Sequence, residues 1–310
     1  MEGRRSRVIA VVGVTGSGKS DYALDIAQAA GAAEIVSADA FQLYRGMDIG
    51  TAKVPLEERR GIVHHEIDVL SIDEPASVAA YQTHARRDIA AIVNSGSLPI
   101  VCGGSGLYVR ALLDRLEFPG TSPEIRSALE TEAERLGSAH LHRRLRAVDP
   151  ASAERINPAN VRRLVRALEV YELTGRPFSA TLPTYDSVYD TVFVALGWED
   201  DVLRRRIDER TQVMFSAGLV DEVERLRERG LEASPTARRA TGYPEVLAYL
   251  DGAATLDDTR AAVAQQTWRL VKRQYKWFKR DPRLHVIAGD DARARRRWCE
   301  RTVANLAAST

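Results

Sequence analysis

The sequence predicts an α/β fold, in which a parallel β-sheet core with helices on both faces is interrupted by an all-helical insertion. Short β-branched runs alternate with helical stretches through the first third of the chain, as expected of βαβ units. Residues 123–173 then contain no strand-like run, and a strand pattern returns at 191–198. The length of 310 residues suits about two domains. We therefore assign residues 1–117 and 191–310 to the core and 118–190 to the insertion.

Each element follows from a local pattern of apolar residues, with a period of two in strands and of about 3.6 in helices. In the first third we expect strands at 8–12, 34–37, 65–70 and 98–102, and helices at 21–30 and 78–94. The insertion should hold three or four helices and end at the breaker Gly175-Arg176-Pro177. After it we expect a strand at 191–198, helices at 202–217, 219–229 and 259–279, a short strand at 284–287 and a last helix.

Composition excludes several classes of protein. Two cysteines, Cys102 and Cys299, cannot form a disulfide scaffold for a chain of this length, so a reducing cytoplasmic setting fits. No apolar run is long enough to cross a membrane, and the apolar run after the basic start is too short for a secretory signal. The net charge of +1 at first argues against nucleic acid. That total is a misleading average, because arginines cluster in the insertion and in the late helix.

The strongest local motif is GVTGSGKS, which fits the P-loop pattern G-x-x-x-x-G-K-[ST] between a strand and a helix. Its glycines allow backbone N–H groups to point at phosphate oxygens, Lys19 adds a positive charge, and the Ser20 hydroxyl can ligate Mg²⁺. The alternative is a glycine-rich turn that binds nothing, which the strand–loop–helix context disfavours. The motif thus predicts a polyphosphate site formed by Gly13, Val14, Thr15, Gly16, Ser17, Gly18, Lys19 and Ser20.

The sequence around the P-loop favours group transfer over hydrolysis. Hydrolytic P-loop proteins usually hold Mg²⁺ with an Asp that ends an apolar strand. The run at 98–102 continues into Gly103-Gly104-Ser105 without an acid, and Asp68 lies within its run rather than after it. Asp39 directly follows the second strand and is the candidate base. Asp39 could equally be a cap or turn residue, and Ser105 an ordinary serine in a glycine turn.

Four blocks in order, GVTGSGKS, SADAFQLYRGMDIGTAK, PIVCGGSGLYVRALL and INPANVRRLVRALEVYELTGRP, resemble the bacterial tRNA dimethylallyltransferases. The resemblance extends from Val8 to about Arg280, and YRGMDIGTAK is its most specific part. It implies a P-loop core with a helical insertion, in agreement with the pattern above. It also implies transfer of a dimethylallyl group from dimethylallyl diphosphate to the N6 amine of the adenosine 3′ to the tRNA anticodon.

The resemblance assigns roles at the reacting centre. Asp39 would take the amine proton as the base, flipped out of the anticodon loop, attacks the allylic carbon. Lys19, Ser20 with Mg²⁺, and Arg210 would neutralise charge on the departing diphosphate. Ser105 stands where the family commonly has Thr, which keeps the hydroxyl. Ala40 stands where many relatives have Ser, so a hydroxyl contact is lost there.

The tRNA contacts implied by the resemblance lie beside Asp39, in the insertion and in the RATGY segment. They are Asp39, Ala40, Phe41, Gln42, Ser105, Arg126, Arg162, Arg163, Leu164, Val165, Arg166, Arg239, Thr241, Gly242 and Tyr243. For any one arginine cluster, a solvated basic face is the ordinary alternative. In residues 268–280 the aromatic side chains should pack on the core while the charges face solvent or RNA phosphates. His140 and His142 are expected at the surface, because a two-residue spacing splays them apart on a helix.

Two other classes of function stay open. A small-molecule or nucleoside kinase would use the same loop for ATP and Asp39 as the base for a hydroxyl. A nucleotide-binding regulatory or RNA-binding module would perform no chemistry. The YRGMDIGTAK block and the arginine-rich insertion have no reason to appear in a kinase, and a module does not need Asp39, Ser105 and Arg210 together. We expect a monomeric cytoplasmic transferase that uses Mg²⁺ and has no membrane partner.

Overall fold

The computed structural model describes residues 5–181 and 185–307, and it divides into two compact units. The larger unit combines the chain up to Leu113 with the chain from Ser187 onward, and the smaller unit spans Asp114–Asp186. The smaller unit begins and ends four residues earlier than the expected insertion, 118–190. It ends before residue 190 because Asp190 is already the first residue of a core strand and pairs with Arg7.

The described part of the larger unit contains a six-stranded, wholly parallel sheet with the order β3-β2-β4-β1-β5-β6. Parallel strands covered on both faces are near-continuous apolar runs, as the sequence pattern indicated. The strands are β1 (Arg7–Val12), β2 (Ala33–Ser37), β3 (His64–His65), β4 (Leu98–Gly103), β5 (Asp190–Gly197) and β6 (Leu284–Ala288).

The expected strand at 65–70 is wrong for most of its length. Only His64 and His65 pair with β2, because Glu66 and Asp68 both adopt φ = 58°, a left-handed conformation that ends a strand. Asp68 consequently lies in a bend after β3, where its carboxylate binds the Lys53 ammonium at 2.5 Å. It is therefore not an acid at the end of a strand.

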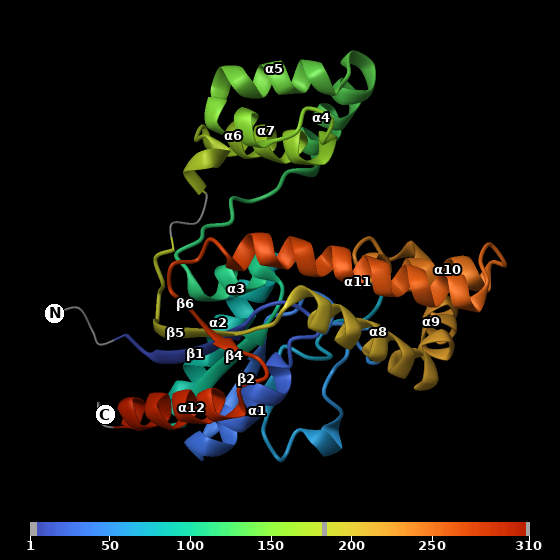
Figure 1. The fold of residues 1–310 in the computed structure, drawn as a ribbon. Coiled ribbons are helices and arrows are strands. Elements are labelled where there is room, and N and C mark those ends of the chain that lie inside the picture. The colour runs from blue at the N-terminus through green and yellow to red at the C-terminus, as the bar shows by residue number, and fades with distance from the viewer. Residues whose placement is uncertain (1–4, 182–184, 308–310) are drawn as a thin grey trace. The chain divides into compact units, whose positions relative to one another are not determined.

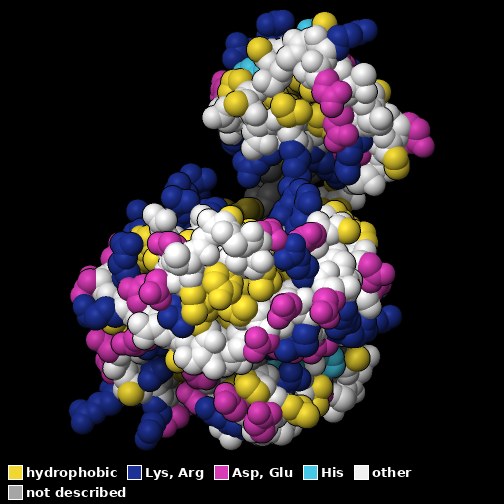
Figure 2. Space-filling view, turned by 90° about the vertical axis from the view of Figure 1, so that its right-hand side faces the viewer, with side chains coloured by type: hydrophobic (Ala, Val, Ile, Leu, Met, Phe, Trp, Pro, Cys, Tyr) yellow, Lys and Arg dark blue, Asp and Glu magenta, His cyan; other side chains and the backbone are white. Residues whose placement is uncertain are grey.

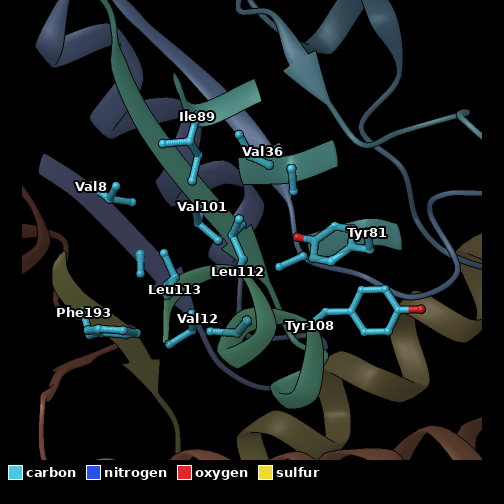
Figure 3. Close-up of a cluster of buried hydrophobic side chains, with 14 of the residues drawn as sticks. Val8, Val12, Val36, Tyr81, Ile89, Val101, Tyr108, Leu112, Leu113 and Phe193 are labelled. Atoms are coloured by element: carbon cyan, nitrogen blue, oxygen red, sulfur yellow. The ribbon is translucent and has the colours of Figure 1, made fainter. Parts of the chain in front are cut away.

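Helices cover both faces of the sheet (Figure 1). α1 (Lys19–Ala30) and α12 (Ala292–Ala307) pack on one face, and α2 (Val78–Asn94) and α3 (Gly106–Leu113) pack on the other. In the second layer, Ile89 of α2 and Leu112 of α3 belong to the same buried cluster as Val101 of β4 (Figure 3). This core fixes the carboxyl ends of β1, β2 and β4, from which the functional loops emerge.

A group of helices follows β5 in the larger unit and packs on the segment between β2 and β3. Tyr44 and Met47 of that segment are fully buried among residues of these helices. The helix α10 was not expected from the sequence; it begins directly after Gly242 of the RATGY segment, whose φ is 98°. The helices are α8 (Asp200–Ser216), α9 (Leu219–Glu228), α10 (Tyr243–Leu250) and α11 (Leu256–Phe278), with 3₁₀ turns at Leu231–Ala233 and Ala237–Arg239.

The smaller unit is helical throughout its described residues, with its own apolar core. Ser122, Asp149 and Asn160 cap the amino ends of three of its helices through their side chains. His142 corrects one expectation: it is buried, with Nε2 2.9 Å from the Ala153 carbonyl oxygen, because α6 packs against α5. The helices are α4 (Pro123–Leu136), α5 (Ser138–Val148), α6 (Pro150–Arg155) and α7 (Val161–Thr174), followed by the 3₁₀ turn Phe178–Thr181.

Among the described residues, no helix combines the length and apolar character needed to cross a membrane.

Candidate active site at the P-loop

The GVTGSGKS motif forms the expected loop between β1 and α1. Gly13, Gly16 and Gly18 have φ values of 141°, 78° and 85°, which residues with a side chain rarely adopt. Space around Gly16 is also restricted, since a Cβ there would lie 3.4 Å from a side-chain carbon of Ile207. Within the described structure, the buried Ser17 hydroxyl has no hydrogen-bond partner. The loop thus presents polar groups to an anion.

Three side chains from the second half of the chain brace the loop backbone. The Thr15 amide donates to Gln274 Oε1, Arg206 Nε donates to the Gly16 carbonyl, and Trp198 Nε1 donates to the Ser17 carbonyl, each at 2.9 Å. The Arg206 guanidinium also stacks on Trp198, 4.4 Å from the ring centre. Sequence reasoning missed all three residues, because no local motif marks a side chain that binds a distant loop.

Lys19, Asp39 and Arg210 line one cavity of about 70 Å³ inside the larger unit, as the assigned roles require. A second cavity, of about 50 Å³, shares Thr15, Lys19, Asp39, Thr51 and Arg210 with the first. The two cavities therefore lie on either side of the same three charged groups, Lys19, Asp39 and Arg210. Apolar side chains of α8 and α11 line much of the first cavity, whereas the lining of the second is mainly polar.

Two cations, Lys19 and Arg210, face this site, and no described residue pairs with either side chain directly. Burial lowers the pKa of Lys19, and Arg210 lowers it further, against the opposing influence of Cys102 and Asp39. Burial also lowers the pKa of Arg210, and the negative charge of Asp39 opposes that shift. In the described part of the chain, neither cation forms a hydrogen bond or ion pair through its side chain. Partly buried cations without a partner suit a multiply charged anion.

Asp39 lies in a turn at the carboxyl end of β2. Its Oδ1 accepts the Phe41 amide at 2.9 Å, and Ser105, at the end of β4, accepts the Ala40 amide on its Oγ at 3.2 Å. Ser105 therefore holds the turn that carries Asp39, although it is not among the residues that line the two cavities. Gly103 permits this approach, since a Cβ there would lie 2.3 Å from the Ala38 carbonyl oxygen.

The hydroxyl oxygen of Ser20 fits Mg²⁺ better than a transition metal. Ser20 lines the second cavity, and a hydroxyl oxygen is a hard ligand. The described residues contain no cluster of three or more His, Cys, Asp or Glu side chains suited to a metal ion. A Mg²⁺ ion at this site would depend on oxygens of its phosphate ligand, as is usual for Mg²⁺.

The YRGMDIGTAK segment is held by two buried charges. Lys53 Nζ donates to the Tyr44 carbonyl at 2.6 Å and to Asp48 at 2.7 Å, besides its contact with Asp68. Glu222, which sequence reasoning missed, accepts the amides of Asp48, Ile49 and Gly50 and the hydroxyl of Tyr243 at 2.7–3.0 Å. These contacts fix Gly50 and Thr51 in the wall of the first cavity.

The structure separates the residues assigned to tRNA into different groups. Arg162, Arg163 and Arg239 are exposed, whereas Phe41, Gln42 and Thr241 line the cavities. Other basic side chains also reach the surface. On the face of the molecule drawn in Figure 2, Lys and Arg side chains form separate groups with acidic side chains between them. A net charge near zero is therefore compatible with local basic surfaces.

Three of these assignments need correction, and two more residues have a further role. Leu164, Val165 and Tyr243 are buried in apolar cores, at 0–2% exposure, so their side chains cannot contact RNA directly. Arg126 and Arg166 both bind the carboxylate of Glu169, which is fully buried. Although burial alone would raise it, the pKa of Glu169 is lowered by these hydrogen bonds and by that of the Ser122 amide. Arg126 and Arg166 therefore have a structural role in the smaller unit, and their assignment to tRNA stays a prediction, because both side chains are partly exposed.

The P-loop after β1 and the paired cations beside Asp39, at the carboxyl ends of a parallel sheet, define a protein of the P-loop α/β class. Comparison with known proteins narrows this class. The IPP transferase family model matches residues 42–281, so the chain belongs to the IPP transferase family.

Curated relatives are similar over nearly their whole length. A tRNA dimethylallyltransferase of Streptomyces coelicolor is 53% identical over 91% of this chain and 90% of its own. A tRNA dimethylallyltransferase of Kocuria rhizophila is 51% identical over 93% of this chain and 92% of its own. Among solved structures, a full-length tRNA isopentenylpyrophosphate transferase of Bacillus halodurans has 34% identity and a TM-score of 0.72, with 97% of each chain covered. A eukaryotic dimethylallyltransferase acting on tRNA has 27% identity and a TM-score of 0.80, over 92% of this chain and 74% of that chain.

Proposed function

We propose that this protein transfers a dimethylallyl group from dimethylallyl diphosphate to the N6 amine of the adenosine 3′ to the anticodon of tRNA, with release of diphosphate. The observation that carries the proposal is that Lys19, Arg210 and Asp39 line one cavity. Cations for a leaving diphosphate and a base for an incoming amine are thus adjacent. The relatives named tRNA dimethylallyltransferase support this reaction.

The diphosphate end of the donor fits the P-loop. A hollow of about 390 Å³ beside the loop is lined by Gly16, Gly18, Lys19 and Ser20 of the loop together with Arg206 and Arg210. Acidic side chains of Asp21, Glu58 and Glu209 also reach this hollow, so its cations are concentrated on the side of the loop. Bound Mg²⁺, held by Ser20 and the donor, would supply further charge neutralisation. Because these groups are fixed before the reaction, they stabilise the charge that develops on the departing diphosphate.

The acceptor amine fits the Asp39 side of the cavity. Exocyclic amines of adenine are weak nucleophiles, so removal of a proton during attack assists the reaction. Asp39 accepts that proton on its carboxylate, while Ser105 holds the turn in position through the Ala40 amide. The adenine must leave the base stack to reach an interior cavity, and Phe41, Gln42 and Thr241 would then surround it.

We place the enzyme in the cytoplasm as a monomer. Cys102 and Cys299 are both free and buried, which suits a reducing compartment.

Radiolabelled dimethylallyl diphosphate and unmodified tRNA provide the direct test. The purified chain with Mg²⁺ should move label into tRNA, and a tRNA that lacks adenosine next to the anticodon should receive none. A kinase with the same loop would instead transfer phosphate from ATP to a small molecule without tRNA. Absence of label transfer together with such phosphorylation would overturn the proposal.

A further inference from the structure

His64 and His65 are adjacent on β3, yet they face opposite sides of the sheet. In the register of the parallel pair, His64 lies beside Ile35 and His65 beside Val36. Residues side by side in neighbouring strands point to the same face. His65 points to the α2 side, where its Nε2 lies 2.7 Å from Glu34 and its Nδ1 3.9 Å from Asp88.

His64 points to the α1 side, the same face as Ile35 and Ser37. Asp39 continues this two-residue alternation beyond the end of β2, and Ser37, Asp39 and His64 all line the second cavity. The volume of about 50 Å³ is enough for about three water molecules, and the polar lining offers them partners. Asp39 and His64 are therefore joined by a small polar chamber.

The hydrogen bonds of His64 leave one ring nitrogen available. Nδ1 lies 2.9 Å from the Ile62 carbonyl oxygen, which can only accept, so Nδ1 carries the proton and donates it. In the neutral ring Nε2 is then an acceptor. Burial, with the nearby charges of Arg59 and His65, lowers the pKa of His64 against the opposing bond to Ile62. The ring is therefore neutral near pH 7.

The other polar groups of this chamber cannot readily take a proton. Ser37 Oγ donates to Gln42 Oε1 at 2.9 Å, and Gln42 Nε2 donates to the carbonyls of Thr51 and Ala52. Burial raises the pKa of Cys102 to about 11, so it remains a thiol. Lys19 and Arg210 are the cations assigned to the diphosphate. Apart from the Asp39 carboxylate, His64 is thus the one group among the described residues lining the chamber that can accept a proton.

We propose that His64 accepts, through water in this chamber, the proton that Asp39 removes from the acceptor amine. This inference rests on the proposed transfer reaction. The amine N–H bond breaks and the Asp39 carboxylate is protonated as the new carbon–nitrogen bond forms and diphosphate leaves. Asp39 then gives the proton to a water, which passes one to His64 Nε2. The imidazolium releases it to bulk solvent, so both groups return to their starting states.

The substitution His64→Asn gives a sharp test. The Asn amide can still donate to the Ile62 carbonyl, but it cannot take up a proton. We expect kcat at saturating donor and tRNA to fall about tenfold, less than the 10²- to 10⁴-fold typical of a direct general base. The KM values should be unchanged. Added imidazole should restore turnover, and the acid limb of kcat that reflects His64 should disappear from the pH profile.

His65→Gln is the matched control on the same strand. It keeps a donor for Glu34, lies on the other face, and should leave kcat and the absence of a response to imidazole unchanged. The acid limb of kcat should remain and move slightly upward, because the charge of His65 no longer lowers the pKa of His64. If His64→Asn unfolds in a thermal melt, His64→Gln replaces it with the same expectations. Unchanged kcat, or a lower kcat without rescue by imidazole, would overturn the inference. So would a raised KM for tRNA at unchanged kcat, because His64 would then bind the base. Failure of the wild-type protein to transfer label would instead refute the proposed function itself.

Discussion

The side chain of Gln274 accepts the Thr15 amide of the P-loop at 2.9 Å, while its Nε2 donates to the Gly104 carbonyl at 3.0 Å. Gly104 precedes Ser105, whose hydroxyl binds the turn that carries Asp39. One buried amide on α11 thus connects the expected diphosphate site with the expected base. This connection explains how the two halves of a transfer site can be held in register.

Replacement of Gln274 by Ala should misalign the P-loop. We expect KM for dimethylallyl diphosphate to rise about tenfold, since two buried hydrogen bonds are lost and about 1.4 kcal/mol corresponds to a factor of ten. Gln274→Glu should also raise KM: its carboxylate keeps the acceptor for Thr15, but it cannot donate to the Gly104 carbonyl and places a negative charge in the cavity that holds Lys19 and Arg210. Steady-state kinetics measure both, with Gln265→Ala at an exposed position of α11 as the control. Equal KM values for wild type and Gln274→Ala would contradict this role.

Asp39→Ala should lose turnover while it keeps most of its affinity for tRNA. Removal of a base typically costs 10²- to 10⁴-fold in rate, so we expect kcat to fall by at least about 100-fold. Filter binding should show a Kd for tRNA within about twofold of wild type. Turnover near the wild-type rate would show that Asp39 is not the base.

Arg163→Ala and Arg166→Ala should behave differently although both residues lie on α7. Arg163 is exposed, so its loss should weaken tRNA binding. The slope of the logarithm of the tRNA binding constant against the logarithm of salt concentration should fall by about one, and affinity for the diphosphate should be unchanged. Arg166 binds Glu169 and two carbonyls of residues 119–120, so its loss should cost about 1–3 kcal/mol of stability. Binding measured against salt and urea unfolding separate the two. If the salt dependence of tRNA binding were the same for Arg163→Ala as for wild type, Arg163 would be an ordinary solvent-exposed arginine that does not contact RNA.

Tyr243→Phe should reduce stability without affecting the tRNA contact. The Tyr243 hydroxyl donates to the buried Glu222 carboxylate at 2.7 Å, and a hydrogen bond to a charged group contributes about 1.5–3 kcal/mol. Urea unfolding should show this loss, while the salt dependence of tRNA binding stays as in wild type. Tyr249→Phe on the same helix is the control. A changed salt slope in Tyr243→Phe would restore this residue to the RNA surface.

Glu66→Gln should stabilise the protein at high pH. Burial, then a hydrogen bond to Asp88 and its negative charge, raises the pKa of Glu66 from about 4.5 to about 8. The unfolded chain therefore releases this proton at lower pH than the folded chain, and the contribution of Glu66 to stability is lost as pH rises from about 4.5 to 8. Gln remains neutral, so its gain over wild type should grow by more than about 1 kcal/mol between pH 5 and pH 8.

Urea unfolding at the two pH values measures this difference, and Glu57→Gln at an exposed position is the control. A gain that is the same at pH 5 and pH 8 would mean that Glu66 is ionised throughout.

The sequence by itself determined the elements that depend on neighbouring residues. Apolar periodicity located five of the six sheet strands and the long helices to within a few residues, and the P-loop needed only its glycines and Lys19. The place of Asp39 directly after the second strand marked it as a candidate base, and the resemblance added Arg210; both residues line one cavity. These features were predictable because hydrogen bonding along a helix, or φ at a glycine, is set locally.

Only the tertiary structure decided which polar and charged side chains are buried. Glu222 and Gln274 have no local motif, yet each binds backbone groups far away in the sequence. Tyr243, Leu164 and Val165 lie in segments assigned to RNA, yet packing from other helices covers them. His64 and His65 look alike in sequence, but their places on opposite faces of the sheet give them different surroundings. The physical reason is that burial and partners depend on which elements pack together, whereas local conformation depends on adjacent residues.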